Sequence, residues 1–125
     1  MSLKDKTSSA IVAVTDLDRA KRFYGETLGL PAEGDMEGVA AFRTGETTLV
    51  VYQSDGVLPG SGNAVVWGGG GDVEAIASEL REKGVKLEEY PELGMAFENG
   101  VHRQDDFRAI WFKDPDGNVL HVNSM

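Results

Sequence analysis

Two histidines are the residues of this chain best suited to acid–base chemistry or metal binding, and His121 has the more informative surroundings. It follows the turn in FKDPDGNVLHV, residues 112–122. DPDGN is typical of a tight turn, since proline fixes φ and glycine permits a positive φ. The apolar residues on both sides predict two strands joined by that turn. On the outgoing strand His121 could be a metal ligand, a general base or a sheet residue with a structural hydrogen bond.

The remaining composition restricts the available chemistry. The chain has no cysteine, which excludes disulfides, thiolate nucleophiles and zinc–thiolate sites. No Ser-His-Asp arrangement can be read from the spacing, so nucleophilic catalysis has little support. Four glycines, Gly68 to Gly71, precede a predicted helix. They lack the lysine and the spacing of a phosphate-binding loop, and we interpret them as the end of a strand and a loop.

Length and charge place the chain among soluble proteins of one compact domain. It has 125 residues, 41% of them hydrophobic, and a formal net charge of −9. An acidic surface repels nucleic acid and anionic membranes and attracts cationic ligands, although it also serves solubility alone. No membrane-spanning run and no signal peptide are apparent. We therefore expect a cytoplasmic protein that binds neither nucleic acid nor membranes.

The chain consists of two self-similar halves. Residues 15–30 and 71–85 both have the apolar spacing of an amphipathic helix, with Asp16 and Asp72 as predicted N-caps. Each helix follows one predicted strand and precedes three more. The predicted strands are residues 8–14, 31–36, VAAFRTG and TTLVVYQ in the first half, and residues 63–67, VKLEEY, FRAIWFK and NVLHVN in the second.

This repetition predicts an α+β fold of two tandem βαβββ modules, at about 8–53 and 63–123, within a single domain spanning residues 1–125. The Gly, Ser and Pro-rich segment 54–62 is the expected linker. Each module should form part of a curved, half-open mixed sheet with a concave face, and two such faces can enclose a pocket.

The second half carries an additional segment at residues 91–107. A loop of that length is either a binding element or a surface excursion. Met95, Phe97 and Val101 give it apolar anchors, which favours a lid over the pocket.

The paired modules resemble the vicinal oxygen chelate superfamily, which includes glyoxalases, bleomycin-resistance proteins and extradiol dioxygenases. The resemblance rests on Asp-Leu-Asp, Phe23-Tyr24 and Leu28-Gly29-Leu30 in the first half and on FKDPDGN in the second. It implies the fold described above and a homodimer. It does not specify the reaction, because one fold serves many chemistries.

Metal-dependent members of that superfamily usually place His and Glu ligands on the first and last strand of each module. The resemblance assigns these four positions to Ser9, to Val50 or Val51, to one of residues 63–65, and to His121. Only His121 is a good ligand, and one imidazole does not hold a divalent ion. We therefore expect no metal cofactor. A divalent ion held by His121 with Gln53, Glu98 or His102 remains the alternative.

The same strands supply candidate contacts for an organic ligand. Tryptophan rings could stack on a flat or cationic molecule, although they are also common in protein cores. The candidate ligand-binding residues are His121, Trp67, Tyr52, Gln53, Ser9, Phe97 and His102. We expect a metal-free small-molecule-binding protein, similar to the branch that sequesters antibiotics. The alternative is a metal-dependent lyase, isomerase or dioxygenase with an atypical ligand set, so whether the chain is an enzyme stays open.

Overall fold

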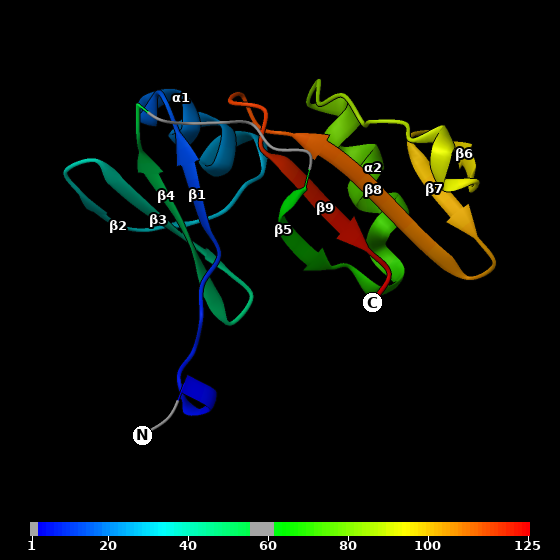
Figure 1. The fold of residues 1–125 in the computed structure, drawn as a ribbon. Coiled ribbons are helices and arrows are strands. Elements are labelled where there is room, and N and C mark those ends of the chain that lie inside the picture. The colour runs from blue at the N-terminus through cyan, green and yellow to red at the C-terminus, as the bar shows by residue number, and fades with distance from the viewer. Residues whose placement is uncertain (1–2, 56–61) are drawn as a thin grey trace. The chain divides into compact units, whose positions relative to one another are not determined.

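The computed structural model describes residues 3–55 and 62–125, and its fold is α+β, with two mixed β-sheets and α-helices packed on them (Figure 1). The chain divides into two compact units, Met1–Leu58 and Pro59–Met125. Most of the expected linker, residues 56–61, lies outside the described residues. Within the described residues no helix is long and apolar enough to cross a membrane.

The first unit contains a four-stranded sheet in the order β1-β4-β3-β2. Its strands are β1 (Ile11–Val14), β2 (Ala32–Met36), β3 (Val39–Thr44) and β4 (Thr47–Gln53), and a short 3₁₀ turn, η1 (Leu3–Asp5), precedes them. β1 and β4 are parallel, and the other pairs are antiparallel. The predicted βαβββ order is therefore present, with a first strand shorter than the expected residues 8–14.

A short α-helix, α1 (Leu17–Lys21), continues as a π-helical segment, η2 (Arg22–Thr27), and packs on this sheet. Asp16 is the N-cap as predicted, because its carboxylate accepts a hydrogen bond from the Arg19 N–H at 3.0 Å. The Oε1 atom of Gln53 accepts a second one from the Leu17 N–H at 3.2 Å. The end of β4 is thereby attached to the start of the helix.

The second unit contains a five-stranded sheet in the order β5-β9-β8-β7-β6. Its strands are β5 (Asn63–Gly68), β6 (Ala96–Glu98), β7 (Val101–Gln104), β8 (Phe107–Lys113) and β9 (Val119–Asn123). β5 is parallel to β9, and the other pairs are antiparallel. The helix α2 (Val73–Glu82) follows a 3₁₀ turn, η3 (Gly70–Asp72), and the Asp72 side chain makes no capping bond there.

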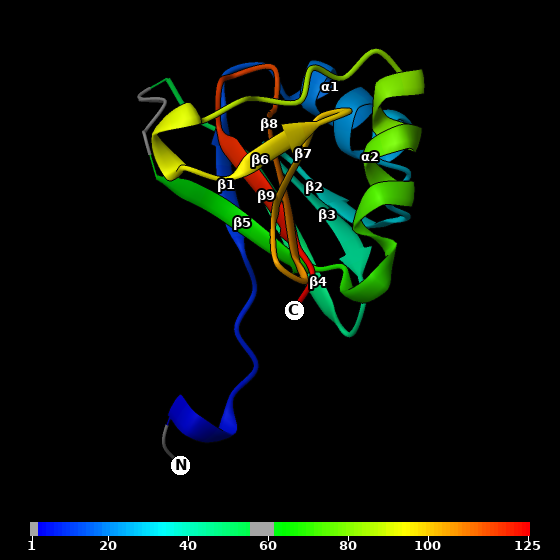
Figure 2. The ribbon, with the colours of Figure 1, turned by 90° about the vertical axis from the view of Figure 1, so that its right-hand side faces the viewer.

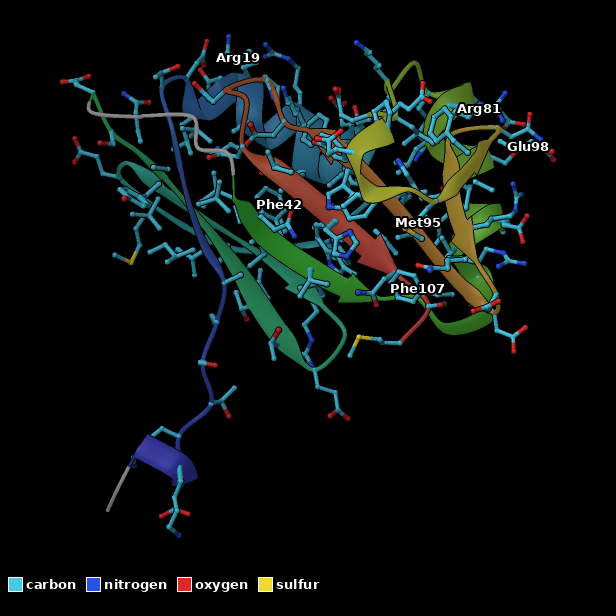
Figure 3. All side chains as sticks on the ribbon, turned by 45° about the vertical axis from the view of Figure 1, so that its right-hand side comes forward. Arg19, Phe42, Arg81, Met95, Glu98 and Phe107 are labelled. Carbon is cyan, nitrogen blue, oxygen red and sulfur yellow. The ribbon has the colours of Figure 1, made fainter. Side chains whose placement is uncertain are left out.

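The prediction of a strand at VKLEEY is wrong, because residues 85–90 have no regular structure. β7, which comes from the segment expected to be a lid, pairs with residues 107–109 of β8, and along the rest of this edge the Glu88 N–H donates to the Trp111 carbonyl without a ladder forming. Residues 96–98 and 101–104 form a hairpin that extends the sheet. Arg81 of α2 donates to the Asn99 carbonyl at the turn of this hairpin, at 3.5 Å, and Figure 3 shows Arg81 near Glu98.

Alternation along the strands sorts the side chains of the second sheet onto two faces. Ile110, Phe112 and Leu120 are buried, as are the residues of α2 on its apolar face, Val73, Ala77 and Leu80. Figure 2 shows α2 on one side of the sheet and the turn η4 (Pro91–Leu93) on the other. We call the side away from α2 the open face of the second sheet.

The predicted DPDGN turn is held by one buried carboxylate. Asp114 is 4% exposed, and its oxygens accept hydrogen bonds from the Asp116 N–H, the Asn118 N–H and the Asn118 side-chain amide at 3.0, 2.8 and 2.8 Å. These bonds fix the start of β9 and with it the position of His121.

Replacing Asp114 by Ala should therefore destabilise the protein by about 3 kcal/mol, since it leaves buried donors without a charged acceptor. Urea unfolding followed by tryptophan fluorescence measures the change. Asp106→Ala, in the exposed turn between β7 and β8, is the matched control and should change the free energy of unfolding by less than about 0.5 kcal/mol. Equal losses in both variants would contradict this role of Asp114.

Candidate functional site: an aromatic row on the second sheet

Four rings form a continuous row across the open face of the second sheet. Phe97, His102, Trp111 and His121 come from β6, β7, β8 and β9 in turn. The distances between successive ring centroids are 4.8, 5.0 and 4.4 Å, and the Trp111 and His121 planes are nearly parallel at 16°. We call these four residues the aromatic row. It brings together three of the predicted contacts, His121, Phe97 and His102, with a tryptophan that was not chosen from the sequence.

Strand register explains why these rings meet. Trp111 stands opposite His121 in the β8–β9 ladder, and Phe97 stands opposite His102 in the β6–β7 ladder. Since Phe112 is buried on the α2 side, its neighbour Trp111 must point to the open face. That alternation was the available signal for Trp111 in the sequence.

Both ring nitrogens of His121 are hydrogen-bonded within the sheet. The Ile110 carbonyl accepts from Nδ1 at 3.0 Å, so Nδ1 carries the proton. The side-chain amide of Asn123 then donates to Nε2 at 3.1 Å, while its Oδ1 accepts from the Met125 N–H at 3.1 Å. His121 is thus an uncharged ring fixed in one tautomer.

His102 is more completely buried than His121, at 1% exposure. Its Nε2 accepts a hydrogen bond from the Tyr90 N–H at 3.0 Å, which again places the ring proton on Nδ1. That Nδ1 is buried, and no described residue gives it a partner with good hydrogen-bond geometry. The Tyr90 ring lies against the His102 ring at 6.1 Å and against the Trp111 ring at 5.4 Å.

Tyr90 belongs to a segment that leaves the sheet and crosses its open face. We call residues 88–95 the strap; it contains η4. The Glu88 N–H donates to the Trp111 carbonyl at 2.8 Å, next to the edge that β7 leaves free. Of the predicted lid, residues 91–107, only residues 91–95 belong to this strap, whereas the β6–β7 hairpin belongs to the sheet.

Burial lowers the pKa of both histidines below the ordinary value of 6.5. For His121 the hydrogen bond to the Ile110 backbone acts in the opposite direction, more weakly. For His102 the backbone of Ala109 and the carboxylates of Glu89 and Glu92 also oppose burial and are weaker. Both rings are therefore uncharged at neutral pH.

A pocket of about 430 Å³ lies beside His121 on the open face, at β5 and β9. Ala64 and Val66 line it from β5, His121 and Asn123 from β9, and Met125 closes one side. None of its lining side chains is charged. The net charge of −9 can therefore act on a ligand here only from a distance.

The structure places the other predicted contacts elsewhere. Trp67 lies on the α2 side of the second sheet, where it stacks on Phe112 at 6.5 Å. Trp67 therefore does not join the aromatic row. Tyr52, Gln53 and Ser9 belong to the first unit. Tyr52 lies on β4, Gln53 caps α1, and Ser9 lies on the exposed segment before β1.

A family model described as Glyoxalase/Bleomycin resistance protein/Dioxygenase superfamily matches residues 7–122. The chain belongs to this superfamily. The match includes most of both units, in agreement with the resemblance inferred from the sequence. A search of curated proteins found no significant match to the chain.

Solved structures from several branches share the fold. A glyoxalase/bleomycin resistance protein from Streptomyces sp. CB03234 is 28% identical, with 93% of this chain and 99% of that one covered and a TM-score of 0.66. A lactoylglutathione lyase from Agrobacterium tumefaciens is 18% identical, with 95% and 92% covered and a TM-score of 0.71. The fosfomycin resistance protein FosX from Mesorhizobium loti is 15% identical, with 97% and 92% covered and a TM-score of 0.68.

The divalent ion that many members of this superfamily use does not fit the residues present. On the open face of the second sheet Val66, rather than one of residues 63–65, stands opposite His121. In the first sheet Ile11 stands opposite Val50. Of these four side chains only His121 is a good ligand, and both of its nitrogens are already hydrogen-bonded. No group of three potential ligands occurs among residues 3–55 and 62–125.

The lowered histidine pKa values predict a specific acid sensitivity. Between the folded-state pKa and 6.5 the unfolded chain binds more protons than the folded one. The free energy of unfolding should therefore fall as pH decreases through this window, and it should be flat above about pH 7.5. The pKa values of Glu33 and Glu74 lie below 4.5, so these two carboxylates change the free energy of unfolding only in stronger acid.

Urea unfolding between pH 5 and 8 measures this dependence. The double variant His102→Gln, His121→Gln should lose most of the slope between pH 5 and 7. A slope equal to that of the unmodified protein would show that neither histidine is held uncharged by the fold.

Proposed function

We propose that this protein binds a small organic molecule on the open face of its second sheet, without a metal ion. The observation that supports this most directly is the aromatic row beside a pocket without charged lining. Stacked rings give a planar ligand a large contact area at low entropic cost, and Asn123 and Asn63 can donate or accept hydrogen bonds. Sequestration of an antibiotic is one role compatible with such a site.

The residues that carry the proposal are Trp111, His121, Phe97 and His102, together with the pocket residue Asn123. Trp111 and His121 form the stacked pair next to the pocket, so a ligand at Val66 changes the surroundings of both. Contacts of the ligand with Ser9, Tyr52 and Gln53 stay a prediction, whereas for Trp67, on the α2 side of the sheet, we now expect no contact.

The alternative is a metal-dependent lyase, isomerase or dioxygenase, which the relatives suggest. It requires ligands beyond His121, and the strands that should supply them carry Ile11, Val50 and Val66. Elemental mass spectrometry after incubation with Ni²⁺, Mn²⁺, Fe²⁺ or Zn²⁺ separates the two functions. A stoichiometric ion that is lost in His121→Ala would support the enzyme and contradict our proposal.

We also propose that the protein is a homodimer. Ile11 on the first sheet and Val66 on the open face of the second sheet are apolar side chains that are 62% and 59% exposed, as expected for surfaces covered in an assembly. Light scattering coupled to size-exclusion chromatography should give the mass of two chains, and the mass of one chain at micromolar concentration would contradict it.

Ligand binding can be followed through the two tryptophans. In a Trp67→Phe background, titration with a panel of neutral, cationic and anionic aromatic antibiotics should give saturable quenching of Trp111 in the presence of EDTA. Trp111→Leu should weaken binding of the same compound at least about tenfold, which is about 1.4 kcal/mol. Calorimetry provides the readout for that variant.

Trp67→Leu is the matched control, because Trp67 lies on the α2 side of the same sheet. It should leave the affinity unchanged to within about twofold, since it removes no contact with the open face. Equal losses in the two variants, or binding that requires added metal, would contradict the proposed function.

A further inference from the structure

We propose that His102 is a latch: its uncharged ring holds the strap over Trp111, and uptake of a proton by this ring releases the strap and opens the aromatic row. The latch itself is a property of the second unit alone. Its consequence, that acid controls access of a ligand, rests on the function proposed above.

The closed arrangement requires a lone pair on His102. The Tyr90 N–H donates to Nε2 of this ring at 3.0 Å. In the protonated ring both nitrogens are donors, so Nε2 would point an N–H at the Tyr90 N–H. The hydrogen bond cannot exist in that form, and two buried donors would face each other.

Besides this bond, the Tyr90 ring packs against His102 and Trp111, and the Glu88 N–H bonds the Trp111 carbonyl at the beginning of the strap. The bonds from Leu93 to Tyr90 and from Gly94 to Pro91 lie within the strap itself. Residues 89 and 91–94 are exposed. A segment with most of its residues exposed opens at a low free-energy cost, and loss of one buried hydrogen bond is a large part of that cost.

The groups around His102 oppose opening on protonation only weakly. From β6 and β8 the ring meets Phe97 and Trp111, which are uncharged. Arg103, its neighbour on β7, is engaged with Glu74 of α2 at 2.6 Å. The charges that act on the ring are Glu89 and Glu92 of the strap, and their effect is smaller than that of burial.

Linkage then fixes the direction of the effect. Because the pKa of His102 is below 6.5 in the closed state, protons bind better to any state in which the ring is hydrated, and so they favour that state. Opening also exposes the His102 Nδ1 atom to water. In the closed arrangement this atom has no hydrogen-bond partner of good geometry. The strap should therefore remain closed at neutral pH and open in acid.

The amide proton of Tyr90 reports directly on the latch. We would measure its hydrogen exchange by NMR from pH 5 to 8, corrected for intrinsic exchange, together with the ring signals of His102. The protection factor of the Tyr90 amide should fall at least about tenfold in acid. The midpoint of this fall should coincide with the midpoint of the His102 titration and lie below about pH 6.5.

Three variants distinguish a latch from a merely structural residue. His102→Gln keeps an acceptor that cannot be protonated, so Tyr90 should stay protected at all pH values. His102→Leu removes the acceptor, and Tyr90 should be unprotected throughout. Glu92→Gln removes a carboxylate that favours the charged ring, and the midpoint should move to lower pH.

His121→Gln is the matched control, because it removes the other buried histidine of the row. The Tyr90 ring packs on His102 and Trp111 rather than on His121. The Tyr90 profile should be unchanged in it. Protection that persists after His102 is protonated, or that shows the same pH profile in His102→Gln, would overturn the latch. Since the readout needs no ligand, these results are independent of whether the proposed binding function holds.

Discussion

Two imidazole rings remain uncharged in the interior of the second sheet, and the candidate site depends on this constraint. His121 donates from Nδ1 and accepts a side-chain N–H at Nε2. His102 accepts a main-chain N–H at Nε2, and its Nδ1 is buried. A charge on either ring would be desolvated and would break an acceptor bond, and the carboxylates of Glu89 and Glu92 offset burial of His102 only in part. The flat stack of Trp111 on His121, and the position of the strap over it, both follow from the uncharged state.

The same constraint is the basis of our proposal that the site is metal-free. The last strand of the second module presents an imidazole whose lone pair is used by Asn123. The strand beside it presents Val66, an apolar side chain. The surface that would coordinate an ion is instead suited to rings and neutral hydrogen-bonding groups. Shared architecture thus carries a different local chemistry, which is why relatives alone do not identify the ligand.

Local signals in the sequence predicted much of the fold. Asp16 caps α1 and Asp114 holds the turn because both act within four residues of their partners. The strand expected at 85–90 is absent because this segment makes one hydrogen bond to the edge of β8, from Glu88 to Trp111, rather than a ladder, while the distant strand β7 pairs with residues 107–109. Trp67 was chosen from the sequence and Trp111 was not. Alternation places Trp111 on the face opposite to Phe112, but that this ring meets His121 depends on the register of β8 against β9.

The chain contains two histidines, so one measurement can test the claim that both rings are uncharged. Long-range ¹H–¹⁵N NMR of the imidazole rings at pH 7.5 resolves four nitrogens and assigns each tautomer. The account predicts that both rings are uncharged with the proton on Nδ1, and that adding Zn²⁺ or Ni²⁺ leaves the His121 Nε2 signal in place. A proton on Nε2 of either ring, or a stoichiometric metal-induced shift of His121, would contradict it.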